Sequence, residues 1–271
     1  MSKKCLSSPI LAIVTIIMCA IAALSFCACD KKTDNIYEHD NSFEYTVTDG
    51  EDTLVYEPKD VNYTYGIIFY VGMFIAPSEY DYLGEALAKQ GYLVVIPKLE
   101  LNNANSGYLE NESAFTKYPN VKFFVGGHDI GGGAAIRRAQ ENPNSVVGTV
   151  LYTPIGISKQ VFDENGKLKY DEDGNVVWNR FGIEKQSLPT LLLETDCKSL
   201  RTEAMVIDAK KRLNPTTTEE HILENSCHFA FMSSATQSDA ISISNDEIAA
   251  QHKNTVSLTL AFMRKTVLKQ K

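Results

Sequence analysis

The sequence lacks the features that mark nucleic-acid-binding and metal-binding proteins. Its 271 residues carry 26 Lys and Arg against 34 Asp and Glu, and no basic stretch is interleaved with aromatic residues. A nucleic-acid surface needs such a stretch, so we expect no nucleic-acid partner. The sequence also lacks zinc-like Cys/His spacing and a G-x-G-x-x-G motif, and the acidic turns at Asp163 and Asp171 lack the spacing of a calcium loop. We therefore expect no metal and no cofactor.

The N-terminus has the pattern of an export signal. Two lysines precede an uncharged run over residues 10–26, as in the charged and apolar regions of a signal peptide. The run ends in residues 26–29, Phe-Cys-Ala-Cys, which resemble a bacterial lipoprotein box. We expect Cys29, which follows a small residue, to carry the lipid, with Cys27 as the alternative. The run is also close to the length of a single transmembrane anchor, which is the other interpretation.

These signals divide the chain into three parts. Residues 1–28 form a lipoprotein-type signal peptide, residues 29–42 a polar flexible tether, and residues 43–271 one folded domain. A hydrophobic content of 44% over this length is enough for one good core. The expected location is the cell envelope, lipid-anchored to the membrane on its extracytoplasmic side.

From residue 43 onward, strand and helix signals alternate. Strands are predicted over residues 43–47, 53–56, 66–71, 92–96, 121–125, 146–152, 190–195 and 218–223. Helices are predicted over residues 79–90, 113–117, 130–141, 202–213 and 246–267. This alternation predicts an α/β fold with a mostly parallel central sheet flanked by helices.

Residues 155–187 interrupt the alternation. Asn165-Gly166 and Asp173-Gly174 are two-residue hairpin turn signals, each flanked by short alternating runs. We interpret the segment as a small β-hairpin excursion that acts as a lid.

A glycine-rich motif stands between the predicted strand 121–125 and helix 130–141. Its core, Gly-His-Asp-Ile-Gly, places Asp129 at the centre with Gly127 and Gly131 two positions away on either side. A nucleophile elbow has this arrangement, because its central residue is strained and the flanking glycines give the turn room. The alternative is that Asp129 only caps the following helix, since Asp is a good N-cap residue.

Two later features favour the elbow. The buried strand 190–195 ends directly before Asp196, where a carboxylate that orients a catalytic histidine would lie, with Glu194 in reserve. His228 follows the next strand in a loop, while the other four histidines lie in the tether, beside the elbow, inside a strand and on the last helix. The order nucleophile, acid, histidine is that of α/β-hydrolases.

Several linked motifs over about residues 66–267 resemble one family. The apolar run 66–70, the segment 91–97, the glycine-rich elbow, and His228 followed by two phenylalanines look like the bacterial α/β-hydrolase fold-5 family, relatives of dienelactone hydrolases. The resemblance implies an α/β-hydrolase fold and a serine hydrolase of esterase or lactonase type. This chain departs from the family at the decisive position, because Asp129 stands where the family has serine.

An aspartate changes the chemistry. A carboxylate that attacks an ester would give an anhydride, but it attacks saturated carbon well and forms an alkyl ester, the logic of haloalkane dehalogenases and epoxide hydrolases. In this hypothesis Asp129 is the nucleophile, His228 activates water, and Asp196 orients His228.

The oxyanion of the second step would be held by backbone N–H groups of Ile130 and of Gly72 or Met73. The substrate is then a small organic molecule. Dehalogenases have tryptophan after the nucleophile, and the only tryptophan here is Trp178, in the excursion. Epoxide hydrolases need a pair of cap tyrosines, and the excursion has only Tyr170. Neither of these activities has support beyond the elbow.

Two other functions stay open. The chain could be a catalytically retired hydrolase fold that binds a ligand or partner as a lipoprotein, with His228 and Asp196 as a structural pair. It could also be a weak esterase or lactonase. Retention of both acid and base favours catalysis.

Cys197 and Cys227 are the two cysteines that remain after the signal peptide and Cys29. They directly follow Asp196 and directly precede His228, in two loops that the proposed mechanism brings together. In an oxidising compartment we expect a disulfide between them, and the alternative is two unpaired thiols.

Overall fold

The computed structural model describes residues 42–102, 104, 113–197, 201–238 and 241–270, which belong to one compact unit spanning Asp40–Lys271. The predicted signal peptide, the cysteine proposed to be lipidated and most of the tether lie outside the described residues. Within the described ranges, no helix has the length and apolar character needed to cross a membrane.

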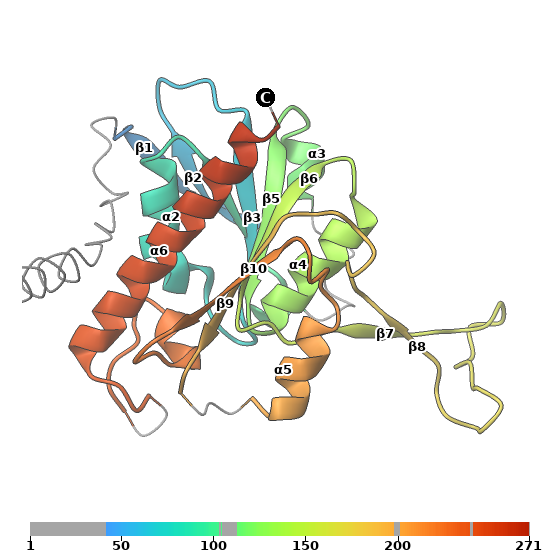
Figure 1. Ribbon diagram of the computed structural model, residues 1–271. Helices are drawn as coiled ribbons and strands as arrows, with labels where there is room; N and C mark the ends of the chain where they lie inside the picture. Colours follow the sequence, from blue (N-terminus) through green and yellow to red (C-terminus); the bar gives the residue numbers. More distant parts are fainter. Residues whose placement is uncertain (1–41, 103, 105–112, 198–200, 239–240, 271) are drawn as a thin grey trace, which may run out of the picture. The chain divides into compact units, whose positions relative to one another are not determined.

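An eight-stranded sheet forms the centre of this unit (Figure 1). Its strands are β1 (Tyr45–Asp49), β2 (Thr53–Pro58), β3 (Tyr65–Tyr70), β4 (Leu93–Pro97), β5 (Lys122–His128), β6 (Val146–Tyr152), β9 (Thr190–Thr195) and β10 (Thr218–Leu223). Their order in the sheet is β1-β2-β4-β3-β5-β6-β9-β10. The β1–β2 and β2–β4 pairs are antiparallel and the other pairs are parallel. The predicted mostly parallel sheet is therefore confirmed.

Helices follow the strands in alternation. The α-helices are α2 (Asp81–Ala88), α3 (Ala114–Lys117), α4 (Ile130–Glu141), α5 (Glu203–Lys210) and α6 (Asn245–Leu268), and the short 3-10 helices are η1 (Pro77–Tyr80), η2 (Glu100–Asn102) and η4 (His228–Phe231). The helix predicted over residues 79–90 is shorter than expected, because its first turn is the 3-10 helix η1.

Helices cover both faces of the sheet, as Figure 1 shows. Successive residues of β3 point to opposite faces, so Ile67 and Phe69 pack in one cluster with α2 and α6, while Ile68 and Tyr70 pack in the other with α4. Both sides of the central strands are therefore buried, which explains their continuous apolar sequences.

The excursion forms an arm of β-structure. Strands β7 (Ser158–Gln160) and β8 (Trp178–Arg180) pair at its base, and both predicted turns are present, with positive φ angles of 75° at Gly166 and 80° at Gly174. The arm projects away from the central sheet (Figure 1). The side chains of Tyr170 and Trp178 on the arm are each 55% exposed to solvent. The hairpin turns are thus confirmed. The arm, however, points away from the central sheet and does not cover it as the expected lid would.

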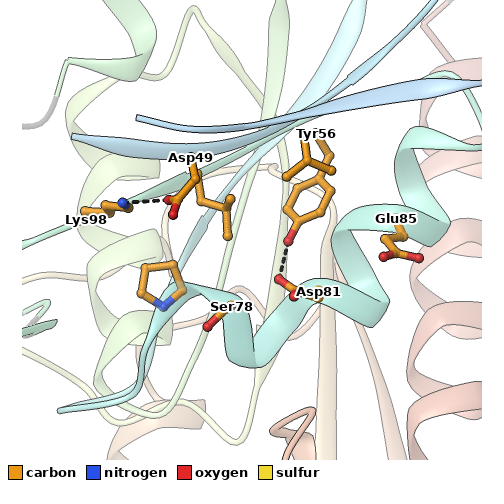
Figure 2. A pocket seen from close by; sticks show the side chains of 9 residues that line it. Asp49, Tyr56, Ser78, Asp81, Glu85 and Lys98 are labelled. Atoms are coloured by element: carbon orange, nitrogen blue, oxygen red, sulfur yellow. Dashed lines mark hydrogen bonds and ion pairs between the residues drawn. The ribbon is translucent and has the colours of Figure 1, made fainter. Parts of the chain in front are cut away.

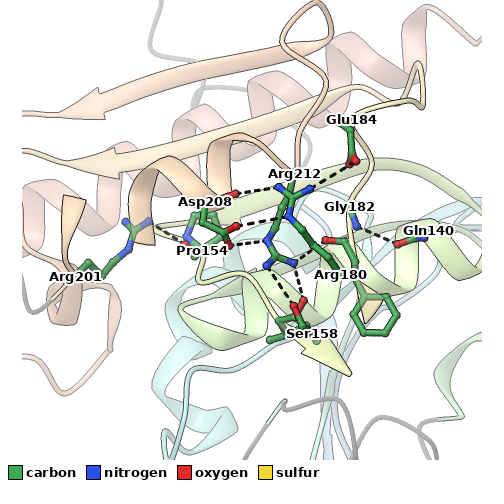
Figure 3. A network of polar contacts seen from close by, with 11 residues as sticks. Gln140, Pro154, Ser158, Arg180, Gly182, Glu184, Arg201, Asp208 and Arg212 are labelled. Carbon is green, nitrogen blue, oxygen red and sulfur yellow. Dashed lines mark hydrogen bonds and ion pairs between the residues drawn. The ribbon is translucent and has the colours of Figure 1, made fainter. Parts of the chain in front are cut away.

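A buried arginine on the body fixes the base of the arm (Figure 3). The guanidinium group of Arg212 donates hydrogen bonds of 2.6 Å to the carbonyl of Ile157 and 2.8 Å to the carbonyl of Phe181. Ile157 directly precedes β7 and Phe181 directly follows β8. Asp208, one helical turn earlier, pairs with the same guanidinium at 2.8 Å. Arg212 thereby holds the two ends of the excursion together.

Candidate functional site

The elbow is formed between β5 and α4, with Asp129 as the single residue between them. Asp129 has φ 57° and ψ −128°, a conformation that costs a non-glycine residue about 1–3 kcal/mol. A Cβ atom on Gly131 would lie 2.1 Å from the carbonyl oxygen of Tyr70, and one on Gly127 would lie 2.3 Å from that of Gly131. Only glycine fits these two positions, so the local sequence explains the sharp turn.

The Asp129 side chain does not cap the helix that it precedes. It makes no capping hydrogen bond, and its Oδ2 instead accepts a hydrogen bond of 3.2 Å from the backbone N–H of Met73, on a separate loop. Its Oδ1 lies 3.5 Å from Nε2 of His228. The carboxylate therefore faces the space between a backbone donor and an imidazole.

This environment keeps the carboxylate ionised. Burial by itself raises the pKa of Asp129, but the hydrogen bond with His228 and the two nearby imidazoles outweigh burial and lower the pKa to about 2. The backbone N–H of Ile130 lowers it further. Two of the backbone groups expected to hold an oxyanion, those of Met73 and Ile130, thus act on this carboxylate.

The Met73 donor belongs to a tight turn after β3. The N–H of Ile75 donates to the carbonyl of Gly72 at 3.2 Å, and Phe74 has a positive φ of 61°. This is the pattern of a type II turn with Met73 in the second position. Gly72, the other expected donor, is used differently, because its N–H lies 3.4 Å from the hydroxyl of Tyr80.

His228 begins the short helix η4 and is 3% exposed. Its Nδ1 lies 2.7 Å from Oγ1 of Thr153, the residue directly after β6. Thr153 is completely buried and has a positive φ of 39°, which is unusual for a β-branched residue. Thr153 could not be predicted from the sequence, because no motif distinguishes a threonine at the end of a strand.

Asp196 does not contact His228. Its carboxylate is exposed and accepts hydrogen bonds from the backbone N–H groups of Asn225, at 2.8 Å, and Ser226, at 2.9 Å. It shapes the loop that leads to His228 without touching the ring. The reserve candidate Glu194 is paired with Arg201 at 2.6 Å. The expected role of Asp196 in orienting His228 thus stays a prediction, and in the structure Thr153 occupies the Nδ1 side of the ring.

His128 is a second buried histidine at the site. Its ring centroid lies 4.5 Å from that of His228, and its Nδ1 lies 2.8 Å from the hydroxyl of Tyr80. Burial, together with the neighbouring His228, lowers the pKa of His128 well below its usual 6.5. His128 is accordingly neutral at pH 7. Through Tyr80 it supports the turn that carries the Met73 donor.

Cys197 and Cys227 lie together, as expected, with their sulfur atoms 2.6 Å apart. Both are free thiols in this structure. The hydroxyl of Ser242 lies 3.4 Å from the sulfur of Cys197. The predicted proximity of the two loops is present, and the disulfide stays a prediction.

A cavity of about 410 Å³ lies elsewhere on the sheet, beside α2 (Figure 2). The charged groups in it already have partners: Lys98 pairs with Asp49 at 2.6 Å, and the Tyr56 hydroxyl donates to Asp81. None of the elbow residues lines this cavity. Among the described residues, no group of three or more His, Cys, Asp or Glu side chains could hold a metal ion.

Comparisons with known proteins identify a family for this chain. The model of a family described as "Alpha/beta hydrolase family" matches residues 66–248, which is more than half of the chain. No curated protein matches the sequence significantly.

Solved structures resemble this chain at low sequence identity. One structure, from work on the metagenome-derived lipolytic enzymes LipS and LipT, has a TM-score of 0.52 and 16% identity, covering 81% of this chain and all of that one. A predicted CIB-like hydrolase from Thermoplasma acidophilum has a TM-score of 0.49 and 16% identity over 83% of this chain and 99% of its own. The thioesterase domain of the curacin biosynthetic pathway has a TM-score of 0.49 and 13% identity over 80% of this chain and all of its own.

Proposed function

Because the chain belongs to the Alpha/beta hydrolase family, we propose that it is a hydrolase with Asp129 as nucleophile and His228 as general base. Its substrate is a small organic molecule with a leaving group on a saturated carbon. One observation carries the proposal: the Asp129 carboxylate does not cap α4 but lies between the N–H of Met73 and Nε2 of His228.

In the first step, Oδ1 of the ionised Asp129 attacks the substrate carbon. A carbon–oxygen bond forms while the bond to the leaving group breaks, and the leaving group departs with the electron pair. The low pKa of Asp129, about 2, supports this step because the nucleophile needs no base to remove a proton at neutral pH. The product is an alkyl ester on Asp129.

In the second step, His228 accepts a proton from water at Nε2 and the water oxygen attacks Cγ of Asp129. Negative charge then develops on Oδ2, which already accepts from the Met73 N–H. The bond from Cγ to the alkoxy oxygen breaks, and the alkoxide takes the proton from His228 and leaves as the alcohol. The new carboxyl group of Asp129 releases the second proton of the water to solvent, which restores the carboxylate. The same backbone donors thus serve the resting carboxylate and the oxyanion.

Esterase or lactonase activity has less support. A carboxylate that attacks an ester would form an anhydride, and Asp129 has no proton for His228 to remove. The ordinary serine pathway is therefore not available to this elbow.

A second candidate, a retired hydrolase fold that binds a ligand or partner, is favoured by the placement of Asp196. Its carboxylate is bound by the N–H groups of Asn225 and Ser226, and among the described residues no acid besides Asp129 contacts the His228 ring. Under this alternative the region around the elbow binds molecules but transforms none.

The test is intact mass spectrometry of the full-length protein with panels of alkyl halides, epoxides and activated esters. The proposal predicts a covalent adduct that carries the alkyl group and accumulates in His228→Gln, since that variant performs only the first step. Asp129→Asn is the matched control, nearly equal in size, and should give no adduct. If no compound is turned over and none forms an adduct, the result would favour the retired fold.

We further propose that the protein is exported and lipid-anchored at Cys29 on the extracytoplasmic side of the membrane, as the N-terminal sequence supports. Metabolic labelling with a palmitate analogue should label the wild-type chain and fail in Cys29→Ser. Cys27→Ser is the matched control and should keep the label. Loss of label only in Cys27→Ser would assign the anchor to that cysteine instead.

A further inference from the structure

The Nδ1 side of the His228 ring is held by a hydroxyl rather than a carboxylate. Oγ1 of Thr153 lies 2.7 Å from Nδ1, and both residues are buried. Resting on the function proposed above, we propose that Thr153 is the positioning residue for His228 and takes the place of the orienting acid. The two acids considered from the sequence, at positions 194 and 196, are engaged with other groups.

The backbone around Thr153 is tied directly to the elbow. The N–H of Asp129 donates to the carbonyl of Tyr152 at 3.2 Å, and the N–H of Ile155 donates to the carbonyl of Asp129 at 2.8 Å. The N–H of Thr153 itself donates to Leu193 on the neighbouring strand at 2.8 Å. The turn that positions the base therefore also positions the nucleophile, through bonds one and two residues away from Thr153.

A hydroxyl offers what a carboxylate cannot, because it both donates and accepts a hydrogen bond. While Asp129 is ionised, its Oδ1 can only accept, so Nε2 of His228 carries the proton and the Thr153 hydroxyl donates to Nδ1. After the ester forms, Nε2 must be free to accept a proton from water, so the ring proton lies on Nδ1 and the hydroxyl accepts it. Thr153 thus supports both tautomers, one for each half of the reaction, with the ring proton exchanged through solvent.

The two steps of the reaction distinguish the positioning of His228 by Thr153 from a purely structural role of Thr153. Thr153→Val keeps the shape of the side chain and removes the hydroxyl, whereas Thr153→Ser keeps the hydroxyl. In Thr153→Val we expect adduct formation on Asp129 within about twofold of wild type, and ester hydrolysis slower by roughly 10- to 100-fold, so that the adduct accumulates. Thr153→Ser should restore hydrolysis to within a few-fold of wild type.

Asp196→Asn provides the competing outcome. If that variant accumulates the adduct while Thr153→Val turns over like wild type, Asp196 orients the ring and our proposal is overturned. A Thr153→Ser variant that is as slow as Thr153→Val would also overturn it, because the hydroxyl would then not be the group that matters.

A second measurement works without any substrate. Nitrogen-15 NMR of the full-length protein reports the protonation of each imidazole nitrogen, and the His228 signals are assigned by their loss in His228→Gln. We expect the Nδ1 shift of His228 to move in Thr153→Val and to return in Thr153→Ser. An unmoved shift would overturn the role of Thr153. If no compound alkylates Asp129, the proposed function fails while the NMR result still decides which residue holds His228.

Discussion

The backbone N–H of Met73 donates a hydrogen bond of 3.2 Å to Oδ2 of Asp129, although 56 positions separate the two residues. The bond joins the turn after β3 to the elbow after β5, and these two strands are neighbours in the sheet. In parallel strands the carboxyl ends meet at one edge, which is where α/β folds build their sites. The relationship makes Met73 a testable part of the mechanism.

Met73→Pro should remove this donor without breaking the turn, because the second position of a type II turn accepts proline. We expect hydrolysis of the alkyl ester on Asp129 to slow by about 10²- to 10³-fold, as for loss of one oxyanion-hole donor. The rate is measured as the loss of adduct by mass spectrometry. Met73→Ala keeps the N–H and should remain within a few-fold of wild type. Equal rates in the proline and alanine variants would rule out a role for this N–H.

His128 predicts a loss of stability in mild acid. Burial lowers its folded-state pKa well below 6.5, so below pH 6.5 the unfolded chain binds a proton that the folded chain does not. The free energy of unfolding should therefore be highest above pH 6.5 and fall as the pH drops, by up to about 1.4 kcal/mol per pH unit for this group. Urea unfolding at pH 7.5, 6.5 and 5.5 measures the slope.

The matched variant is His128→Asn, whose amide can still meet the hydroxyl of Tyr80. In this variant the free energy of unfolding should depend less steeply on pH, because the contribution of His128 to the slope is removed. His252, whose pKa burial also lowers, contributes in the same direction and keeps its share in this variant. An unchanged slope in His128→Asn would mean that His128 is protonated in the folded protein.

Much of the fold follows from local sequence patterns. The strands β6, β9 and β10 and the helix α4 begin and end where the sequence predicts, because each segment is bounded by proline, glycine or a polar turn. The start of helix α6 is fixed by a capping box. The Ser244 hydroxyl accepts a hydrogen bond from the backbone N–H of Glu247, and the Glu247 carboxylate accepts one from the backbone N–H of Ser244. Such signals act over a few residues and can be read without knowing the fold.

The candidate site could be predicted only in part. The elbow at Asp129 and the loop of His228 carry local motifs, so their positions were predictable. The partner of the His228 ring is decided by tertiary packing, since the turn after β6 and the short helix η4 are 75 residues apart at their contact. A carboxylate directly after a strand, such as that of Asp196, has the sequence position of an orienting acid. In the structure it accepts hydrogen bonds from the loop N–H groups of Asn225 and Ser226 instead.

The arm was predicted as a lid because its turn signals reveal hairpins but not their direction. Arg212 decides the direction, as it binds carbonyls on both sides of the base from the body of the domain. Arg212→Gln should leave the carbonyls of Ile157 and Phe181 partly unsatisfied, and each such buried group costs about 1–3 kcal/mol. We expect the arm to be cleaved faster in limited proteolysis, while the rest of the domain resists.

Arg180→Gln is the control for Arg212→Gln. Arg180 lies on the arm itself and its side chain is 37% exposed, so its long ion pairs with Glu184, at 3.6 Å, and Asp208, at 3.5 Å, contribute little. Cleavage within residues 158–180 should therefore be close to wild type in this control. If Arg212→Gln resists proteolysis equally well, the strands of the arm hold themselves together without the arginine.

The thiols of Cys197 and Cys227, 2.6 Å apart, should form a disulfide when the protein is exposed to oxidised glutathione. The bridge would close a loop of about thirty residues, for which the loss of unfolded-chain entropy predicts a gain of about 3.6 kcal/mol in the free energy of unfolding. Because Cys227 directly precedes His228, the bridge would also restrain the loop of the proposed base. Intact mass, as the loss of two hydrogen atoms, and urea unfolding with and without a reductant measure both effects. Cys197→Ser should show neither effect, and an oxidised wild-type protein that is no more stable than its reduced form would contradict the entropic argument.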